Sequence, residues 1–222
     1  MATGIDERLD LKQAGATGVV AVVIAAVASA GIGHLWDFPP TDATAAEITA
    51  YLGEDRTRGI VAMILNTVAV GMWLVVGAAV WLRMRRAAGG ETFYSACFGL
   101  SFAAMVTLVF AGFVPFMVML YRLPGVAEAK LLYDLTFAML AMSGVPTAVA
   151  LVVYAEFVFR TRGLPRATAW FAVVGAAAHV VLLASFAVEE GFFSLQGQVI
   201  TAIPATLFAW IFATSVALAR GR

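Results

Sequence analysis

Charged residues are scarce in this chain. Only 13% of its 222 residues are Asp, Glu, Lys or Arg, whereas soluble domains carry about a quarter. Fourteen acidic and fourteen basic residues give a formal net charge of zero, so there is no electrostatic basis for a nucleic-acid partner. The single cysteine, Cys97, excludes an intramolecular disulfide and a cysteine-rich metal cluster. With 62% hydrophobic residues and a mean hydropathy of +0.92, the composition predicts an integral membrane protein.

Motifs of the common metal, phosphate and nucleophile sites are absent as well. The sequence has no HExxH pair, no glycine-rich phosphate loop and no GxSxG elbow. Its two histidines do not favour haem, because His34 closes the first apolar run while His179 lies near the middle of the fifth. We therefore predict no metal and no cofactor, and the sequence leaves open whether the protein is an enzyme.

Six apolar runs set the fold class. A helix needs about 20 mainly apolar residues to cross the hydrocarbon of a bilayer. Six segments meet that length, at about 15–36, 59–82, 93–120, 131–159, 167–188 and 195–219. The runs are continuously apolar, whereas the strands of a membrane barrel alternate apolar and polar residues. The sequence predicts an all-α polytopic membrane protein in which residues 1–222 form one domain of six transmembrane helices.

Lysine and arginine are unevenly divided between the two sides that this topology defines. The N-terminal tail, the second and fourth connections and the C-terminal tail hold ten of them, and the other side holds four. Cytoplasmic connections of membrane proteins carry the excess of Lys and Arg. We therefore expect both termini to be cytoplasmic and the first connection to be external.

The first external connection predicts a short amphipathic surface helix. Two prolines stop the first span, after which Thr44 with Glu47, or Thr41 with Asp42, offers an N-cap. One side of the helix carries three apolar side chains, those of Ile48, Tyr51 and Leu52. We expect this helix to lie on the outer membrane surface and to end at Gly53.

A small residue recurs at every fourth position of the first span. The stripe consists of Thr17, Ala21, Ala25, Ser29 and Gly33. Such stripes let helix backbones approach closely where no hydrophobic drive brings helices together. The stripe packs either on another span or on another subunit, so a homo-oligomer or a partner subunit is open.

Polar side chains at membrane depth are the best indication of a site, because they are costly in lipid and should face the bundle interior. Asn66, Asp134 and His179 belong to three spans yet share the outer half of the bilayer. Prolines at 115, 146 and 204 favour a cavity there, since each removes a backbone hydrogen bond. We predict a cavity between the second, fourth and fifth spans. Its predicted ligand-binding residues are Asn66, Asp134, His179, Ser143, Met63, Met139 and Tyr133.

Two of these residues also have ordinary structural roles open to them. Asp134 follows Lys130 by one helical turn, so the two side chains can form an ion pair. His179 can be a neutral interior histidine whose hydrogen bonds are satisfied. If the protein performs chemistry, Asp134 and His179 are the candidate acid or base.

Three stretches together are similar to a known family. They are AAEITAYLGEDRTRG before the second span, LLYDL at the start of the fourth, and RTRGLPRATAW between the fourth and fifth. With them the chain resembles, from about Asp42 to Arg220, a poorly characterised domain-of-unknown-function family of six-span integral membrane proteins of high-GC bacteria. The resemblance implies the six-span fold, a bacterial cytoplasmic membrane, and a scaffold role for Tyr133, Asp134 and the turn at 163–165. It implies no activity.

These observations leave three functions open. The first is binding of a hydrophobic or amphipathic small molecule, such as a lipid or isoprenoid, in an intramembrane cavity open to the outer leaflet. The 16 Phe, 5 Trp and 9 Met residues would supply its walls. The second is an integral-membrane enzyme, an isomerase or cyclase, acting on such a ligand. The third is a structural or accessory subunit of a membrane complex.

Overall fold

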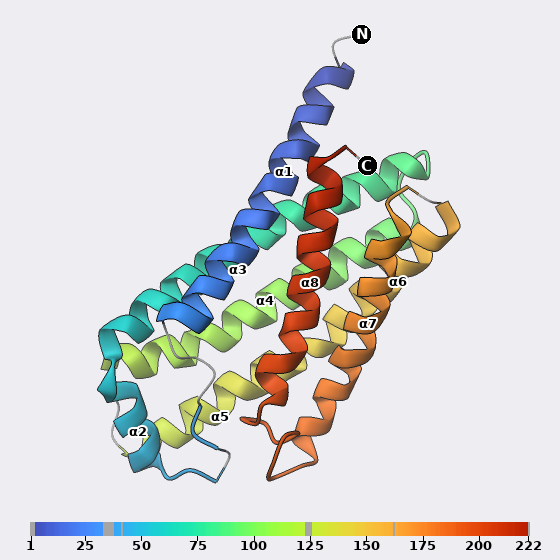
Figure 1. The fold of residues 1–222 in the computed structure, drawn as a ribbon. Coiled ribbons are helices and arrows are strands. Elements are labelled where there is room, and N and C mark those ends of the chain that lie inside the picture. Colours follow the sequence, from blue (N-terminus) through green and yellow to red (C-terminus); the bar gives the residue numbers. More distant parts are fainter. Residues whose placement is uncertain (1–2, 33–37, 41, 123–125, 162, 222) are drawn as a thin grey trace.

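The computed structural model is helical in its regular structure throughout the residues that it describes, which are 3–32, 38–40, 42–122, 126–161 and 163–221. The elements are α1 (Thr3–Ala26), the π-helical segment η1 (Val27–Ile32), α2 (Ala45–Glu54), α3 (Arg56–Ala87), α4 (Phe93–Arg122), α5 (Val126–Met142), α6 (Gly144–Thr161), α7 (Arg166–Leu182), the 3₁₀ turn η2 (Leu183–Phe186) and α8 (Val199–Ala219). Figure 1 shows both termini at one end of an elongated bundle and α2 at the other. We call these the terminal end and the α2 end.

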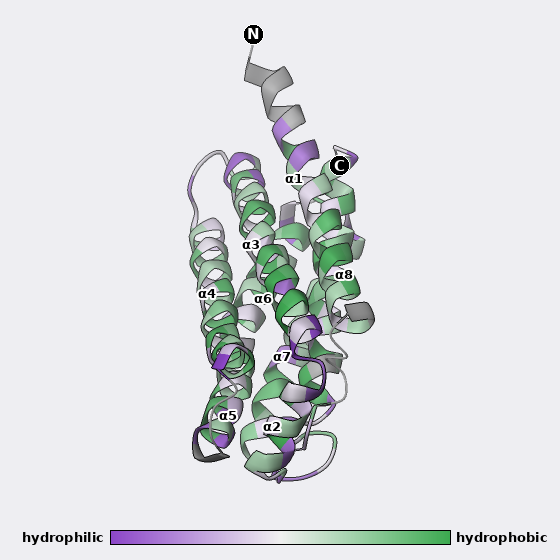
Figure 2. Cartoon of the chain, turned by 90° about the vertical axis from the view of Figure 1, so that its left-hand side faces the viewer, coloured by the Kyte–Doolittle hydropathy of each residue, from purple (hydrophilic) through white to green (hydrophobic). Residues whose placement is uncertain are grey.

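Six segments of the described chain are long and apolar enough to cross a membrane. They are Asp10–Ala30, Arg56–Ala87, Phe93–Arg122, Glu128–Thr161, Arg166–Phe186 and Ala202–Ala219. Large apolar side chains face outward along them, including Leu100, Leu131 and Trp170. In Figure 2 the helices are mostly hydrophobic along their length, and hydrophilic residues gather mainly near their ends. The chain is a multi-pass membrane protein, and the predicted all-helical, six-span fold class is confirmed.

The first and last spans differ from the prediction at their boundaries. α1 begins at Thr3, well before the predicted start, because the polar segment DERLDLKQ continues the helix beyond the apolar run. The predicted end of that span at Trp36, and His34 with it, lie outside the described residues. α8 begins at Val199, later than predicted, because the preceding residues form hydrogen-bonded turns such as Gly197 N to Ser194 O at 2.8 Å.

The fourth span is built from two helices. Ser143 separates α5 from α6, three residues before Pro146. Proline has no backbone N–H, so a helix that runs into it loses one internal hydrogen bond. The other two prolines, Pro115 in α4 and Pro204 in α8, lie inside continuous helices.

α2 is the amphipathic helix predicted for the first connection. Its N-cap is Thr44, whose Oγ1 accepts from the backbone N of Glu47 at 3.2 Å, while the backbone N of Thr44 donates to Glu47 Oε2 at 2.7 Å. The backbone and hydroxyl hydrogen bonds from Thr44 lower the pKa of the Glu47 carboxyl. The apolar side of α2 differs from the expectation, because Ile48 and Leu52 are buried against the bundle, mainly against α5. The helix ends at Glu54, one residue beyond the predicted end.

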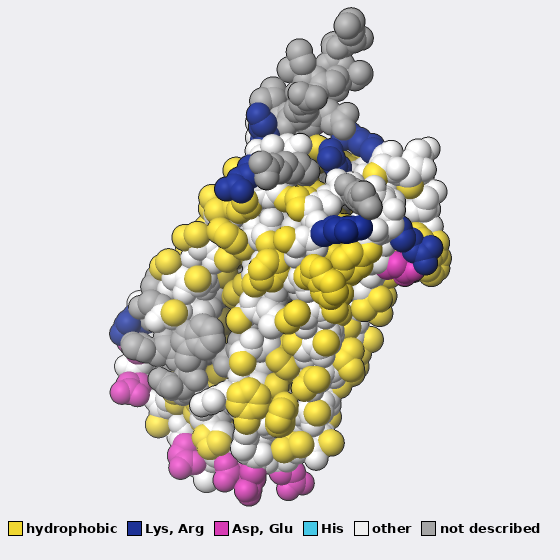
Figure 3. Space-filling model, turned by 45° about the vertical axis from the view of Figure 1, so that its right-hand side comes forward, with side chains coloured by type: hydrophobic (Ala, Val, Ile, Leu, Met, Phe, Trp, Pro, Cys, Tyr) yellow, Lys and Arg dark blue, Asp and Glu magenta, His cyan; other side chains and the backbone are white. Residues whose placement is uncertain are grey.

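Basic and acidic side chains gather mostly at opposite ends of the bundle. Figure 3 shows most of the visible Lys and Arg side chains near the terminal end and most of the visible Asp and Glu side chains at the α2 end. At the α2 end, the guanidinium of Arg56 donates to the backbone oxygens of Leu120, at 2.6 Å, and of Tyr121. These carbonyls belong to the last turn of α4, so Arg56 ties the start of α3 to the end of α4.

The small-residue stripe of the first span packs inside the bundle. Ala21 and Ala25 are buried, and α1 lies against α3 and α8. Ser29 donates to the amide oxygen of Asn66 in α3 at 3.3 Å. Gly33 lies outside the described residues. The partner of the stripe at these positions is therefore another span, and contact with a second copy or subunit stays a prediction.

Two glycines of α1 touch α8 even more closely. A Cβ added at Gly15 would lie 2.5 Å from the backbone N of Ala219 and the backbone O of Ser215. One added at Gly18 would lie 2.0 Å from Ser215 Oγ. Only a residue without a side chain allows helices to approach this closely, so the terminal half of the bundle is closed by backbone contact between α1 and α8.

Candidate ligand-binding cavity

The buried apolar side chains form two clusters with a cavity at their junction. The terminal cluster is centred on Phe98, Phe102, Tyr154 and Trp210, and the α2 cluster includes Phe116, Phe137 and Leu182. Residues from both clusters line a cavity of about 170 Å³. Its lining comes from the halves of the spans nearer the α2 end: Ala25, Ser29, Phe38, Met63, Asn66, Val70, Trp73, Val109, Phe113, Phe116, Thr136, Phe137, Leu140, Ser143, Thr147, His179, Leu182, Ile200, Pro204, Leu207 and Phe208.

Two interruptions of regular helix and one proline inside a helix meet at this cavity. Ser29 belongs to the π-helical segment η1, Ser143 separates α5 from α6, and Pro204 interrupts the hydrogen bonding of α8. Irregular backbone within a membrane is tolerated where it is buried in protein or lines a cavity, and π-helical segments occur frequently at functional sites. The irregular backbone of two spans and the proline of a third are thus concentrated around one hollow.

One face of α3 forms the first polar wall. Met63, Asn66, Val70 and Trp73 recur at helical spacing and all line the cavity. The amide of Asn66 donates from Nδ2 to the backbone O of Ala62 at 3.1 Å and accepts at Oδ1 from Ser29. One Nδ2 hydrogen is left over, because an amide nitrogen carries two. The indole N–H of Trp73 is buried and has no hydrogen-bond partner among the described residues. This wall offers hydrogen-bond donors.

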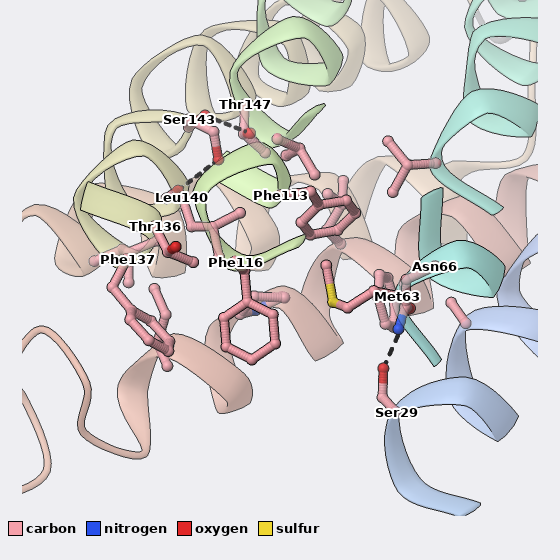
Figure 4. A pocket seen from close by; sticks show the side chains of 18 of the residues that line it. Ser29, Met63, Asn66, Phe113, Phe116, Thr136, Phe137, Leu140, Ser143 and Thr147 are labelled. Carbon is pink, nitrogen blue, oxygen red and sulfur yellow. Dashed lines mark hydrogen bonds between the residues drawn. The ribbon is translucent and has the colours of Figure 1, made fainter. Parts of the chain in front are cut away.

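The opposite wall carries three hydroxyl groups. Figure 4 shows Thr136, Ser143 and Thr147 across the pocket from Ser29 and Asn66, with aromatic rings between them. Thr136 donates to Leu132 O at 2.9 Å, Ser143 to Leu140 O at 2.6 Å, and Thr147 to Ser143 O at 2.7 Å. A hydroxyl has one hydrogen and two lone pairs. Each of these oxygens has therefore used its hydrogen and can act as an acceptor.

His179 of α7 adds a ring nitrogen beside this second wall. Its Nδ1 lies 2.7 Å from the backbone O of Gly175, and a carbonyl can only accept, so Nδ1 carries a hydrogen and Nε2 is the remaining nitrogen. α7 approaches the α5–α6 junction closely here, since a Cβ added at Gly144 would lie 2.7 Å from His179 O. His179 is buried and lines the cavity. A neutral imidazole in this tautomer presents Nε2 as an acceptor.

Formal charge is missing from the cavity lining. None of its lining residues is Asp, Glu, Lys or Arg. Burying an ion without a counter-charge is costly, so this lining favours an uncharged ligand. Donors on α3 and acceptors around the α5–α6 junction and α7 further favour a ligand with a small polar group rather than a pure hydrocarbon.

Phe38 lines the cavity from the connection before α2, and Tyr133 holds that connection. The Phe38 ring lines the cavity and packs edge-on against Phe137, with ring centroids 4.9 Å apart, and against Phe116 at 6.1 Å. The hydroxyl of Tyr133 donates to the backbone O of Pro39 at 2.8 Å. Tyr133 is buried but does not line the cavity, and it anchors the segment that carries Phe38.

The structure brings together some of the predicted site residues and separates others. Met63, Asn66, Ser143 and His179 line one cavity. Tyr133, Asp134 and Met139 do not belong to its lining.

Asp134 has partners near the α2 end. Its Oδ1 accepts from Gln196 Nε2 at 2.9 Å and lies 3.5 Å from Lys130 Nζ. Its side chain is 41% exposed. The alternative role of Asp134, an ion pair with Lys130, is therefore the one that the contacts display.

Most of the lining residues were not site candidates in the sequence analysis, and Trp73, Thr147, Ser29 and Phe38 illustrate why. Trp73 follows Asn66 by seven residues and Met63 by ten, so the helical period of α3 places it on the same face. Thr147 lies one turn beyond Ser143, and Ser29 was considered only as part of the small-residue stripe. Nothing in the sequence marked Phe38 as a cavity residue, because an aromatic residue in a connection does not reveal where the connection folds.

Comparison with known families, curated proteins and solved structures finds no match to the chain.

Proposed function

We propose that this protein binds a small, uncharged hydrophobic molecule that carries a hydroxyl or carbonyl group. A lipid-like or isoprenoid-like molecule has this chemistry. The observation that carries the proposal is the cavity of about 170 Å³, which has aromatic walls and hydrogen-bonding groups of opposite kind on facing sides. Pockets for small molecules combine apolar walls with a few placed polar groups in this way.

The size of the cavity limits what it holds. An apolar cavity of about 150 Å³ accommodates benzene, whereas pockets for drug-sized ligands measure about 300–1,000 Å³. A volume of about 170 Å³ therefore fits a single ring or a short branched unit. A longer molecule would place only its polar, functionalised end in the cavity.

Binding is favoured over catalysis by the positions of the titratable groups. Asp134, a candidate acid, contacts Lys130 and Gln196 and does not border the cavity in which the ligand would lie. His179 is the one titratable side chain among the lining residues. Acid–base chemistry on a bound ligand would need a proton donor and a proton acceptor within hydrogen-bond reach.

The membrane and its sidedness belong to the same proposal. The excess of Lys and Arg toward the terminal end supports cytoplasmic termini, and the family resemblance implies a bacterial cytoplasmic membrane. In that orientation the cavity lies in the outer half of the bilayer, where a ligand would enter from the outer leaflet. Thiol labelling of single cysteines placed in α2 and after Arg86, in protein with Cys97→Ser, tests the orientation, and labelling of α2 from the cytoplasm would overturn it.

Mass spectrometry of molecules that copurify with the protein tests the binding proposal. Wild-type protein is expected to release a neutral molecule that Val109→Phe protein lacks, because Val109 lines the cavity and a phenyl ring would fill it. Val114→Phe is the matched control, since Val114 lies on the same helix and faces outward, 60% exposed. Equal amounts of the same molecules from all three proteins would overturn the proposal.

Folding is checked on the same samples. Val109→Phe and Val114→Phe proteins should both unfold in detergent at temperatures near that of the wild type. For Val109→Phe the reason is that filling a void strains the core less than crowding a packed site. Val70→Phe fills the cavity from α3 and gives an independent second variant. If both cavity-filling variants are folded and retain the molecule, the cavity is not its binding site.

A further inference from the structure

A groove between α7 and α8 lies apart from the cavity, toward the terminal end. It measures about 420 Å³, and the α8 side of its lining consists of Ala209, Phe212, Ala213, Val216, Ala217 and Arg220. These residues recur at intervals of three and four, so they form one face of the helix. Three alanines make a shallow floor, and the ring of Phe212, which is exposed, stands beside it.

α7 supplies the other side of the groove. The lining residues there are the N-cap residue Pro165 and, in α7 itself, Ala167, Thr168 and Phe171. Phe171 is exposed like Phe212, whereas Ala167 adds another small side chain to the floor. The groove therefore has an apolar floor between two aromatic walls on the surface that faces lipid.

The length of the groove matches one leaflet of a bilayer. From Ala209 to Arg220 an α-helix rises about 16 Å, and the hydrocarbon core of a bilayer is about 30 Å thick. The groove thus extends from the membrane surface at the terminal end to about the midplane. An extended acyl chain of one leaflet covers the same depth.

Positive charge lies only at the surface end of this groove. Arg220 lines the groove, and Arg166 lies in the chain between two lining residues, Pro165 and Ala167. Both arginines are exposed, and the lining contains no acidic side chain. A guanidinium binds phosphate oxygens through paired N–H donors. The distribution of charge therefore complements a molecule with an anionic phosphate head and an apolar tail.

We propose that this groove binds an anionic glycerophospholipid. One acyl chain lies over the alanine floor between Phe171 and Phe212, and Arg220 and Arg166 hold the phosphate. The site is independent of the cavity near the α2 end, because the two share no lining residue.

Native mass spectrometry of the full chain in an uncharged detergent tests this site. The protein is titrated with phosphatidylglycerol and, separately, with phosphatidylcholine of the same acyl chains. Wild-type protein is expected to bind phosphatidylglycerol more tightly. Arg166→Gln and Arg220→Gln should each lower its affinity about five-fold, which is the usual contribution of one basic residue near an anionic membrane surface. Affinity for phosphatidylcholine should change less.

Two matched variants separate this groove from general membrane electrostatics. Arg86→Gln removes an exposed arginine at the terminal end of α3 that is not among the lining residues of the groove, and should leave lipid affinity nearly unchanged. Ala213→Trp fills the groove floor and should abolish the specific adduct, whereas Ala177→Trp, at an exposed position of α7 outside the groove, should not. Ala209→Trp is a second filling variant, and thermal unfolding without lipid checks that each protein is folded.

Four results would overturn the proposal. The first is equal affinity for the two lipids, and the second is an equal loss in Arg86→Gln and Arg220→Gln. The third is a full lipid adduct on folded Ala213→Trp and Ala209→Trp proteins. The fourth is competition by inorganic phosphate at concentrations equal to those of phosphatidylglycerol, which would show that the acyl chain contributes nothing.

Discussion

The terminal half and the α2 half of the bundle are built from the same spans but are packed in opposite ways. In the terminal half, the ring of Trp210 lies 5.1 Å from that of Tyr154 and 6.1 Å from that of Phe102, and these aromatic residues fill the core. In the α2 half, rings such as Phe113 and Phe116 surround a hollow. Aromatic content therefore does not decide whether a membrane bundle is closed.

The contact between α1 and α8 distinguishes the two halves, although α6 and α7 also approach closely at Gly144 in the α2 half. Glycines at 15 and 18 bring α1 against the backbone of α8 in the terminal half. In the α2 half, η1 and the break at Ser143 interrupt regular helix where the spans meet, and Pro204 removes one backbone hydrogen bond inside α8. Close approach leaves room only for interlocking side chains. Where regular helix is interrupted, side chains line a space instead.

The two halves also use tyrosine differently. Tyr154 is buried in the terminal half, and its hydroxyl lies 2.6 Å from Thr168 Oγ1 and 3.4 Å from Thr214 Oγ1. This network joins α6, α7 and α8. Tyr133 in the α2 half instead reaches out of the helical core to Pro39. The first hydroxyl holds helices together, and the second holds a connection over the cavity.

The largest effect is expected from a methyl group at the α1–α8 contact. Gly15→Ala should destabilise the protein by about 1–3 kcal/mol, because the nearest atoms are backbone atoms of α8 that cannot move away. Gly71→Ala is the control, since its Cβ would lie 3.8 Å from Phe110 Cζ, an ordinary contact. Alanine favours helix over glycine by about 1 kcal/mol, so Gly71→Ala should be neutral or stabilising. Thermal unfolding in detergent measures both, and equal behaviour of the two variants would contradict the close contact.

Two polar residues test which side chains belong to the cavity. His179→Ala should reduce retention of the copurified molecule about three- to ten-fold, the usual effect of losing one neutral hydrogen bond. Asp134→Asn should leave retention unchanged, because Asp134 contacts Lys130 and Gln196 instead. Quantitative mass spectrometry of the released molecule compares them. If Asp134→Asn protein lost more of the molecule than His179→Ala protein, the functional site would lie around Asp134, outside the cavity.

The tyrosine pair separates stability from ligand exchange. Tyr154→Phe should lower the stability of the fold by about 1 kcal/mol without changing ligand retention, because it removes a buried hydrogen bond in the terminal half. Tyr133→Phe should mainly speed ligand release, because it frees the segment that carries Phe38. Thermal unfolding and the rate of ligand loss after dilution are measured on both. Identical changes in the two variants would show that the halves are not distinct.

The smallest effect is expected from the start of α2. The carboxylate of Glu47 has a lowered pKa because Thr44 donates to it. Its contribution to helix stability is therefore full at neutral pH and is lost as the pH falls through that lowered pKa. Hydrogen exchange of the α2 amides should accelerate at acidic pH in wild-type protein and depend less on pH in Glu47→Gln protein. Equal pH dependence would contradict the role of this carboxylate.

The sequence predicts most of the fold but only part of the site. The length of the apolar runs determines the spans, and the Thr44–Glu47 spacing determines where α2 begins. The depth of Asn66, Ser143 and His179 places them at one level of the membrane. Which face of each helix points inward is set by packing between helices, and the hydropathy of a segment does not reveal it. Depth alone therefore groups Asp134 with His179, although only His179 lines the cavity.

Binding of a matched pair of one-ring probes tests the account most directly. p-Cresol and p-xylene are nearly equal in size, and they differ in a hydroxyl that can donate to the acceptors around Ser143 and His179. We expect both to raise the unfolding temperature of ligand-depleted wild-type protein, p-cresol more than p-xylene, and neither to raise that of Val109→Phe protein. Equal shifts in wild-type and folded Val109→Phe proteins, or no shift in either, would contradict a ligand-binding cavity in the α2 half.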